Sequence, residues 1–107
     1  MAITFKEFQT KAEGVDVHPE RTEQPWQYAL TGLNENSGKF AKILQEELPK
    51  GSLTASGREK AIENAWMALW HLAVACRSAG ISLEEVAERG FFELDHVGDH
   101  HLPENGR

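Results

Sequence analysis

The chain has 107 residues, a mass of 12.0 kDa and a net charge of −6 from 17 acidic and 11 basic residues. This length suits one domain, and the acidic balance disfavours nucleic acid and anionic membranes as partners, because both require a basic surface. The only cysteine, Cys76, cannot form an internal disulfide and fits a small buried side chain in a reducing compartment. We therefore expect a cytoplasmic protein without a signal peptide, and the longest apolar run, 65–76, is too short to span a bilayer.

Two helix patterns occupy the first half of the chain. The first helix is predicted to start at the capping-box pair Thr4 and Glu7 and to end at Gly14. The second is predicted to start near Pro25 and to stop before Pro49, because proline suits the first turn of a helix but cannot continue one. Its predicted buried face follows steps of three and four residues: Leu30, Leu33, Ser37, Phe40 and Leu44.

Two further helix patterns follow, each with its own start signal. Ser56 and Glu59 have the spacing of a capping box and predict the start of the third helix, and Gly80 predicts its end. Ser82 and Glu85 form the same pattern at the start of the fourth helix. No segment shows the alternation typical of a strand, so the sequence predicts an all-α bundle of four helices.

The third helix gives the strongest indication of assembly. Between residues 65 and 76 its only strongly polar side chain is His71. A helix that is apolar on nearly all sides must be covered on more than one of them, and three short partner helices barely achieve this in a monomer. We therefore expect oligomerisation, to a dimer or tetramer, to complete the core. The domain is predicted to span 1–97, with 98–107 as a frayed tail.

Candidate chemical groups are few. His96 and His100 lie four residues apart, but Gly98 between them and the nearby terminus favour a solvated tail over a zinc or nickel site. Trp66 and Trp70 are interpreted more readily as core residues than as a platform on which a base stacks. The sequence contains no GxSxG, phosphate-loop or paired-cysteine motif, so it predicts no catalytic nucleophile.

Two stretches of the chain resemble a known family. They are YALTGLNENSGKFAKIL, at 28–44, and ALWHLAVACRSAGISLEEVAE, at 68–88. Both resemble core helices of the MazG-like nucleotide pyrophosphohydrolases, the all-α NTP pyrophosphatases, and the opening TFKEFQTKA resembles the usual first helix of that family. The resemblance covers Thr4 to about Leu94 and implies a MazG-like four-helix bundle.

The resemblance also implies where a metal site would lie. In the family, an E-x-x-E and an E-x-x-D on successive helices hold magnesium against the phosphates of a nucleotide, and the α–β phosphate bond is cleaved. In this chain the corresponding positions are Asn36, Lys39, Asn64 and Met67, and none of them is acidic. We therefore expect no metal ligands, no catalytic residues and no cofactor at these positions. The chain is interpreted as a degenerate MazG-like protein, without NTP pyrophosphatase activity, that acts through binding.

Several alternatives remain open. The bound species is either a protein partner or a nucleotide-like ligand. If it is nucleotide-like, Lys39 would contact a phosphate and Trp66 or Trp70 would stack on a base. Another hypothesis is a purely structural protein whose apolar third helix is the seam between copies. The enzymatic alternative is a magnesium-dependent nucleoside triphosphate pyrophosphohydrolase with rearranged ligands. Glu35 and Glu63 precede the expected positions by one residue, which rotates a helical side chain by about 100°.

Overall fold

A computed structural model describes residues 2–15 and 24–97, and every secondary-structure element in these ranges is helical. The elements are α1 (Phe5–Glu13), α2 (Pro25–Glu47), the short 3-10 helix η1 (Leu48–Lys50), α3 (Ala55–Ser78) and α4 (Leu83–Val97). The prediction of an all-α chain is confirmed for this part of the sequence. The predicted tail 98–107, with His100, lies outside the described residues.

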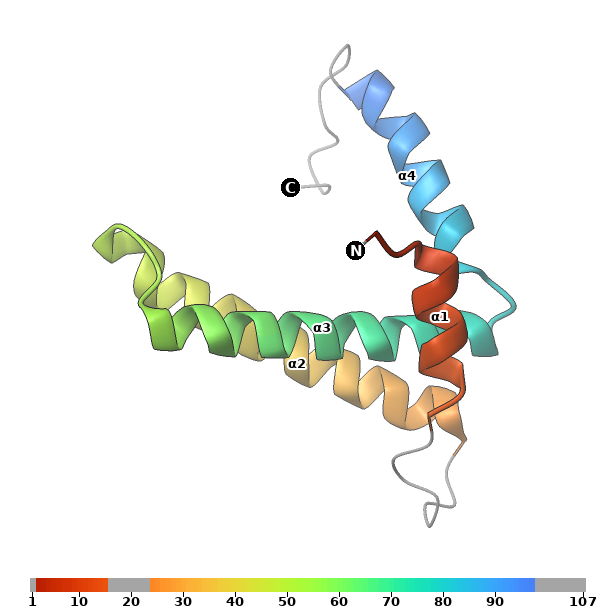
Figure 1. Ribbon diagram of the computed structural model, residues 1–107, viewed down its shortest axis with the longest axis horizontal. Helices are drawn as coiled ribbons and strands as arrows, with labels where there is room; N and C mark the ends of the chain where they lie inside the picture. The colour runs from red at the N-terminus through yellow and green to blue at the C-terminus, as the bar shows by residue number, and fades with distance from the viewer. Residues whose placement is uncertain (1, 16–23, 98–107) are drawn as a thin grey trace.

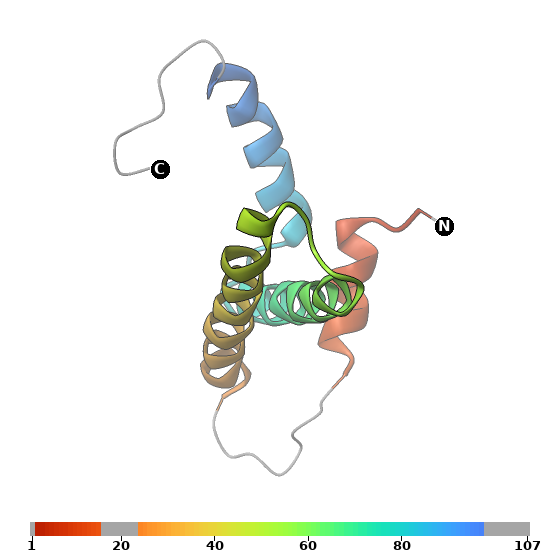
Figure 2. The same ribbon diagram turned by 90° about the vertical axis from the view of Figure 1, so that its left-hand side faces the viewer.

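The two long helices form the body of the molecule. α2 and α3 lie side by side and antiparallel, joined through η1, as Figure 1 and the turned view in Figure 2 show. α1 crosses α3 near the C-terminal end of α3. α4 starts beside α1 and then projects away from the α2–α3 pair. The molecule is therefore a helical hairpin with one crossing helix and one projecting arm.

The predicted boundaries at both ends of α1, at both ends of α2 and at the start of α4 are confirmed. At α1, the backbone N–H of Glu7 donates to the Thr4 hydroxyl at 3.0 Å, and the backbone N–H of Thr4 donates to the Glu7 carboxylate at 2.8 Å. Gly14 follows the last residue of this helix. At α4, Ser82 and Glu85 form the same reciprocal pair at 3.0 and 2.8 Å. Each pair satisfies two backbone donors that would otherwise lack a partner.

The predicted start of the third helix is wrong by two residues. Thr54, not Ser56, is the N-cap of α3, and its hydroxyl accepts a hydrogen bond from the backbone N–H of Gly57 at 2.9 Å. The cause is a contact between helices. The carboxylate of Glu47, at the end of α2, accepts from the backbone N–H of Thr54 at 2.8 Å and from its hydroxyl at 3.1 Å. This tertiary partner fixes Thr54 in its extended cap conformation, so the helix begins directly after it.

The predicted buried face of α2 is also partly wrong. Ala29 and Asn36 are the buried residues of this helix, whereas Leu30 and Ser37 are exposed. Leu33, Phe40 and Leu44 are half-buried, so these three positions agree with the predicted stripe. The face is therefore rotated by about one residue from the predicted stripe. The cause is the close approach of α2 to α3, which favours small residues such as Ala29 at the contact over Leu30.

The core of the single chain is small. Its central cluster consists of Ala12, Ala73 and Leu83, and Phe8, Leu69, Trp70, Leu72 and Cys76 pack against it. Among the described residues, no large side chain is fully buried. Within the same ranges, no helix is long and apolar enough to cross a membrane.

Candidate functional site

The register of the α2–α3 pair determines how the four family positions lie. A Cβ added to Gly32 would collide with the ring of His71, and one added to Gly57 would collide with the Glu47 carboxylate. These two close approaches, one at the η1 end of the pair and one about two turns from its other end, fix the alignment of the helices. Counting along the two antiparallel helices from the contact of Gly32 with His71 puts Asn36 at the level of Met67 and Lys39 at the level of Asn64. The structure thus aligns the four positions in two levels across neighbouring helices.

The polar groups at these positions bond within their own helices. The Asn36 amide donates to the carbonyl oxygen of Gly32 at 2.7 Å, and the Asn64 amide donates to the carbonyl oxygen of Lys60 at 2.8 Å. The ammonium of Lys39 lies 3.2 Å from the carboxylate of Glu35, one helical turn away, and both side chains are largely exposed. Among the described residues, no hydrogen bond or ion pair joins the two helices at these positions, so alignment of the backbone does not bring the functional groups together.

The described residues form no cluster of carboxylates at these four positions. Among residues 2–15 and 24–97, no three side chains of the His, Cys, Asp or Glu type are close enough to hold one metal ion. Glu35, the acid next to a family position, is paired with Lys39. A divalent ion about 4 Å from that ammonium would be repelled by about 8 kcal/mol at an effective dielectric constant of about 20. The residues present therefore do not fit a magnesium site of the family type.

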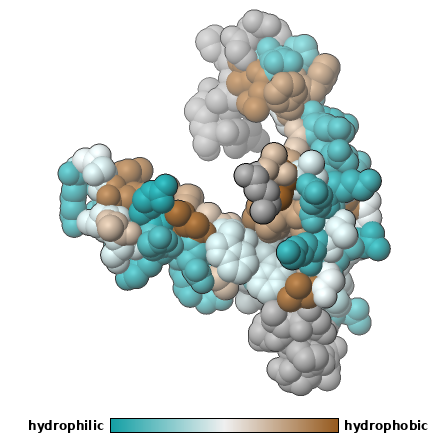
Figure 3. Space-filling model, in the orientation of Figure 1, coloured by the Kyte–Doolittle hydropathy of each residue, from teal (hydrophilic) through white to brown (hydrophobic). Residues whose placement is uncertain are grey.

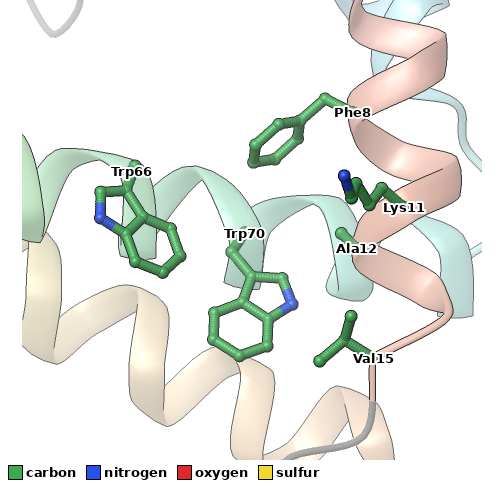
Figure 4. Close-up of a pocket in the computed structure, with 6 residues that line it drawn as sticks. All are labelled: Phe8, Lys11, Ala12, Val15, Trp66 and Trp70. Atoms are coloured by element: carbon green, nitrogen blue, oxygen red, sulfur yellow. The ribbon is translucent and has the colours of Figure 1, made fainter.

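A groove lies elsewhere, where α1 crosses α3. It has a volume of about 450 Å³. Figure 4 shows that Trp66 and Trp70 of α3 form one wall. The opposite wall comes from α1 and the residue that follows its cap: Phe8, Lys11, Ala12 and Val15. We call this the α1–α3 groove. Among the described residues that line it, Lys11 is the only charged one, so this part of the groove offers aromatic and aliphatic surface with one positive group at its edge.

The two tryptophans of the groove differ in burial. Their rings are stacked, with centroids 5.9 Å apart and planes inclined by 21°. Trp70 packs against the core cluster, as the sequence interpretation expected. Trp66 is 44% exposed, so the core interpretation is wrong for this residue. The exposed ring gives the groove a flat aromatic surface, of the kind that aromatic and apolar groups pack against.

The groove depends on Gln9, a residue that the sequence interpretation missed. Gln9 is buried, and its side-chain amide donates to the carbonyl oxygens of Ala73 at 3.1 Å and Ile81 at 3.2 Å. Its side-chain carbonyl accepts from the backbone N–H of Leu83 at 3.0 Å. One side chain thereby links α1 to α3 and to the start of α4. Gln9 lies one turn after Phe5 on the face that carries Ala12, a spacing that could have revealed its buried position.

Three other residues singled out in the sequence, His71, Cys76 and His96, contact neighbouring side chains. His71 is buried where α3 approaches Gly32 of α2, which agrees with a histidine inside the helix pair. Cys76 packs against the core cluster, and its partial burial raises the pKa of its thiol, because burial disfavours the charged thiolate. The ring of His96 makes an edge contact with Phe92, at a centroid distance of 4.9 Å.

Comparisons of the chain with protein-family models, with curated proteins and with solved structures found no match.

Proposed function

We propose that this chain is a binding protein without nucleotide hydrolysis, built as a cytoplasmic homo-oligomer on a MazG-like four-helix scaffold. The observation that carries the proposal is the ion pair between Lys39 and Glu35. At this position a hydrolase of the resembled family carries a metal-binding acid, whereas here an ammonium neutralises the nearest carboxylate. Asn36 and Asn64 bring no charge, and thioether sulfur at Met67 is a poor ligand for magnesium.

The α1–α3 groove supports binding as the mode of action. Ligand sites are typically concave, mostly apolar, and equipped with a few polar groups. The groove combines the aromatic surfaces of Trp66, Trp70 and Phe8 with the ammonium of Lys11. Such a surface suits a protein segment with apolar side chains. It also suits a nucleotide-like ligand whose base stacks on Trp66 while a phosphate meets Lys11.

The proposal is tested by assaying pyrophosphate release from a panel of ribo- and deoxynucleoside triphosphates, with Mg²⁺ or Mn²⁺ and with a chelator control. We expect no metal-dependent release from folded protein. Release that the chelator abolishes would overturn the proposal in favour of a pyrophosphohydrolase with rearranged ligands. In that event Glu35→Gln and Glu63→Gln should reduce the rate, and Glu59→Gln, on the same helix as Glu63, serves as the control.

A second measurement tests the ligand. Titration of the protein with nucleotides, followed by tryptophan fluorescence, should show quenching if a base stacks on Trp66. Lys11→Ala should then weaken binding of a triphosphate more than binding of the corresponding nucleoside, because the ammonium meets only the phosphates. Lys39→Ala is the matched control, since Lys39 lies outside the α1–α3 groove.

A further inference from the structure

The outer half of α4 carries an apolar face that no other element of the described residues covers. Residues at steps of three and four along α4 share this face: Leu83, Ala87, Phe91 and Leu94. Leu83 is buried against the body of its own chain, whereas Phe91 is 75% exposed and Leu94 is 67% exposed. Figure 3 shows apolar surface on this projecting helix. One continuous face therefore begins in the core and continues into solvent.

The core of the single chain is incomplete. In the described ranges no large side chain is fully buried. Large apolar side chains of α4 and of the α1–α3 groove stay exposed in the same ranges, among them Phe91, Phe92, Leu94 and Trp66. A second copy that covers these side chains would complete the core.

The same chain also carries a surface that complements the arm. The α1–α3 groove is apolar and includes the half-exposed ring of Trp66, and Lys11, the one charged side chain among its described lining residues, is positive. α4 has an excess of four negative charges, from five carboxylates against Arg89. The carboxylates are Glu84, Glu85, Glu88, Glu93 and Asp95. An acidic helix with an apolar face thus matches an apolar groove with a basic edge.

We propose that α4 of one copy docks into the α1–α3 groove of a second copy, with Phe91 and Leu94 against Trp66 and the acidic flanks of α4 near Lys11. Each chain contributes one arm and one groove, so reciprocal docking closes a two-fold dimer with two equivalent contacts. Aromatic side chains buried in such a contact dominate its affinity. This inference specifies the partner in the proposed binding function, but the interface itself does not depend on whether the chain hydrolyses nucleotides.

Sedimentation equilibrium over a range of protein concentrations tests this interface. The wild-type chain should sediment as a dimer, or as an even-numbered assembly that contains it. Phe91→Arg in the arm and Trp66→Glu in the groove should each raise the dissociation constant about 30-fold or more, as expected for loss of a dominant aromatic contact. Trp26→Arg is the matched control, since Trp26 is a similarly exposed aromatic residue outside the α1–α3 groove, and it should leave the assembly intact.

Mixing the two variants tests the exchange of arms directly. Phe91→Arg retains an intact groove and Trp66→Glu retains an intact arm, so a mixed dimer has one native contact and one in which opposite charges meet. Equal amounts of the two variants should therefore form a dimer at a protein concentration at which neither variant does so alone. Far-UV circular dichroism checks that each variant remains helical, and Leu94→Arg replaces Phe91→Arg if the latter unfolds.

Several outcomes would overturn the inference. They are a monomeric wild-type chain at every concentration, an assembly unaffected by Phe91→Arg and Trp66→Glu, and a mixture that stays monomeric. Dissociation by Trp26→Arg alone would place the interface on another face and would also overturn it. If Trp66→Glu abolishes nucleotide binding but leaves the assembly intact, the groove holds a small ligand instead. A dimer that releases pyrophosphate would overturn the proposed absence of hydrolysis alone, whereas a monomer without activity would overturn the docking and the proposed assembly but not the absence of hydrolysis.

Discussion

The side-chain amide of Gln9 donates a hydrogen bond to the carbonyl oxygen of Ala73, at a nitrogen–oxygen distance of 3.1 Å, in the interior of the protein. Gln9 belongs to α1 and Ala73 to α3, and the two residues are 64 positions apart in the chain. The same side chain also bonds to the backbone at Ile81 and Leu83. A single polar residue therefore fixes the crossing of α1 over α3, which forms the α1–α3 groove, and the point from which α4 projects.

Gln9→Ala should lower the free energy of unfolding by about 2–4 kcal/mol, because three hydrogen bonds are lost and the buried N–H of Leu83 is left without its partner. Urea denaturation followed by circular dichroism, at one fixed protein concentration, measures the change. Thr10→Ala, at the neighbouring exposed position, is the control and should stay within about 0.5 kcal/mol of the wild type. Equal stability of the two variants would contradict the structural role of Gln9.

Gly32→Ala should destabilise the α2–α3 pair by about 1–3 kcal/mol, because the added methyl group meets the ring of His71 and the packed interface must shift. Gly38→Ala provides the comparison on the same helix. A Cβ at Gly38 meets nothing within 4 Å, so this change should stabilise the protein by about 0.5–1 kcal/mol through higher helix propensity. Thermal unfolding distinguishes the two signs. A Gly32→Ala variant as stable as Gly38→Ala would show that the helices lie further apart.

Thr54→Ala should cost about 1–2 kcal/mol of stability, because α3 loses its N-cap and Glu47 loses one of its hydrogen-bond donors. Ser56→Ala should change stability by less than about 0.5 kcal/mol, since this exposed side chain lies inside the first turn. Chemical denaturation of the two variants decides between the boundary in the structure and the one predicted from sequence. A larger loss for Ser56→Ala would restore the predicted capping box.

Restoring four acids tests the resemblance to the MazG-like family. In the combined variant Asn36→Glu, Lys39→Glu, Asn64→Glu, Met67→Asp, the observed register aligns the four carboxylates in two levels across α2 and α3. We expect this variant to bind Mn²⁺, measured by electron paramagnetic resonance of the free ion, because clustered carboxylates are good ligands for hard cations. The wild-type chain is the reference for the experiment.

A three-acid variant that retains Lys39 is the matched control for this gain of binding. Its ammonium repels the ion, so its affinity for Mn²⁺ should be at least about tenfold lower than that of the four-acid variant. Equal affinities would show that Lys39 does not face the ion. A folded four-acid variant that binds no Mn²⁺ would contradict the alignment of this chain with the family.

Much of the secondary structure could be predicted because its signals are local. The capping boxes at Thr4 and Ser82, the end of α1 at Gly14 and the bounds of α2 at its flanking prolines all depend on residues within one turn of the boundary. The start of α3 could not be placed in the same way. Its cap residue, Thr54, donates hydrogen bonds to the carboxylate of Glu47, which lies seven residues earlier at the end of another helix.

The candidate site was predictable in part. The sequence aligned the four family positions, and the register found in the structure places them in two levels. The sequence did not reveal that Lys39 forms an ion pair with Glu35. Nor did it reveal that the amides of Asn36 and Asn64 form hydrogen bonds within their own helices. Nor did it reveal the α1–α3 groove, because Phe8 and Trp66 are 58 residues apart and meet only when α1 crosses α3.

The sequence by itself determined the helical class, most helix ends, the acidic charge and the non-acidic character of the four family positions, because these follow from composition and from contacts within a few residues. Only the tertiary structure decided which residues face one another. The close approach at Gly32, the link from Gln9 to α3, the exposed ring of Trp66 and the uncovered face of α4 all arise from how rigid helices pack. Packing depends on the shapes of surfaces distant in sequence, and no local pattern specifies them.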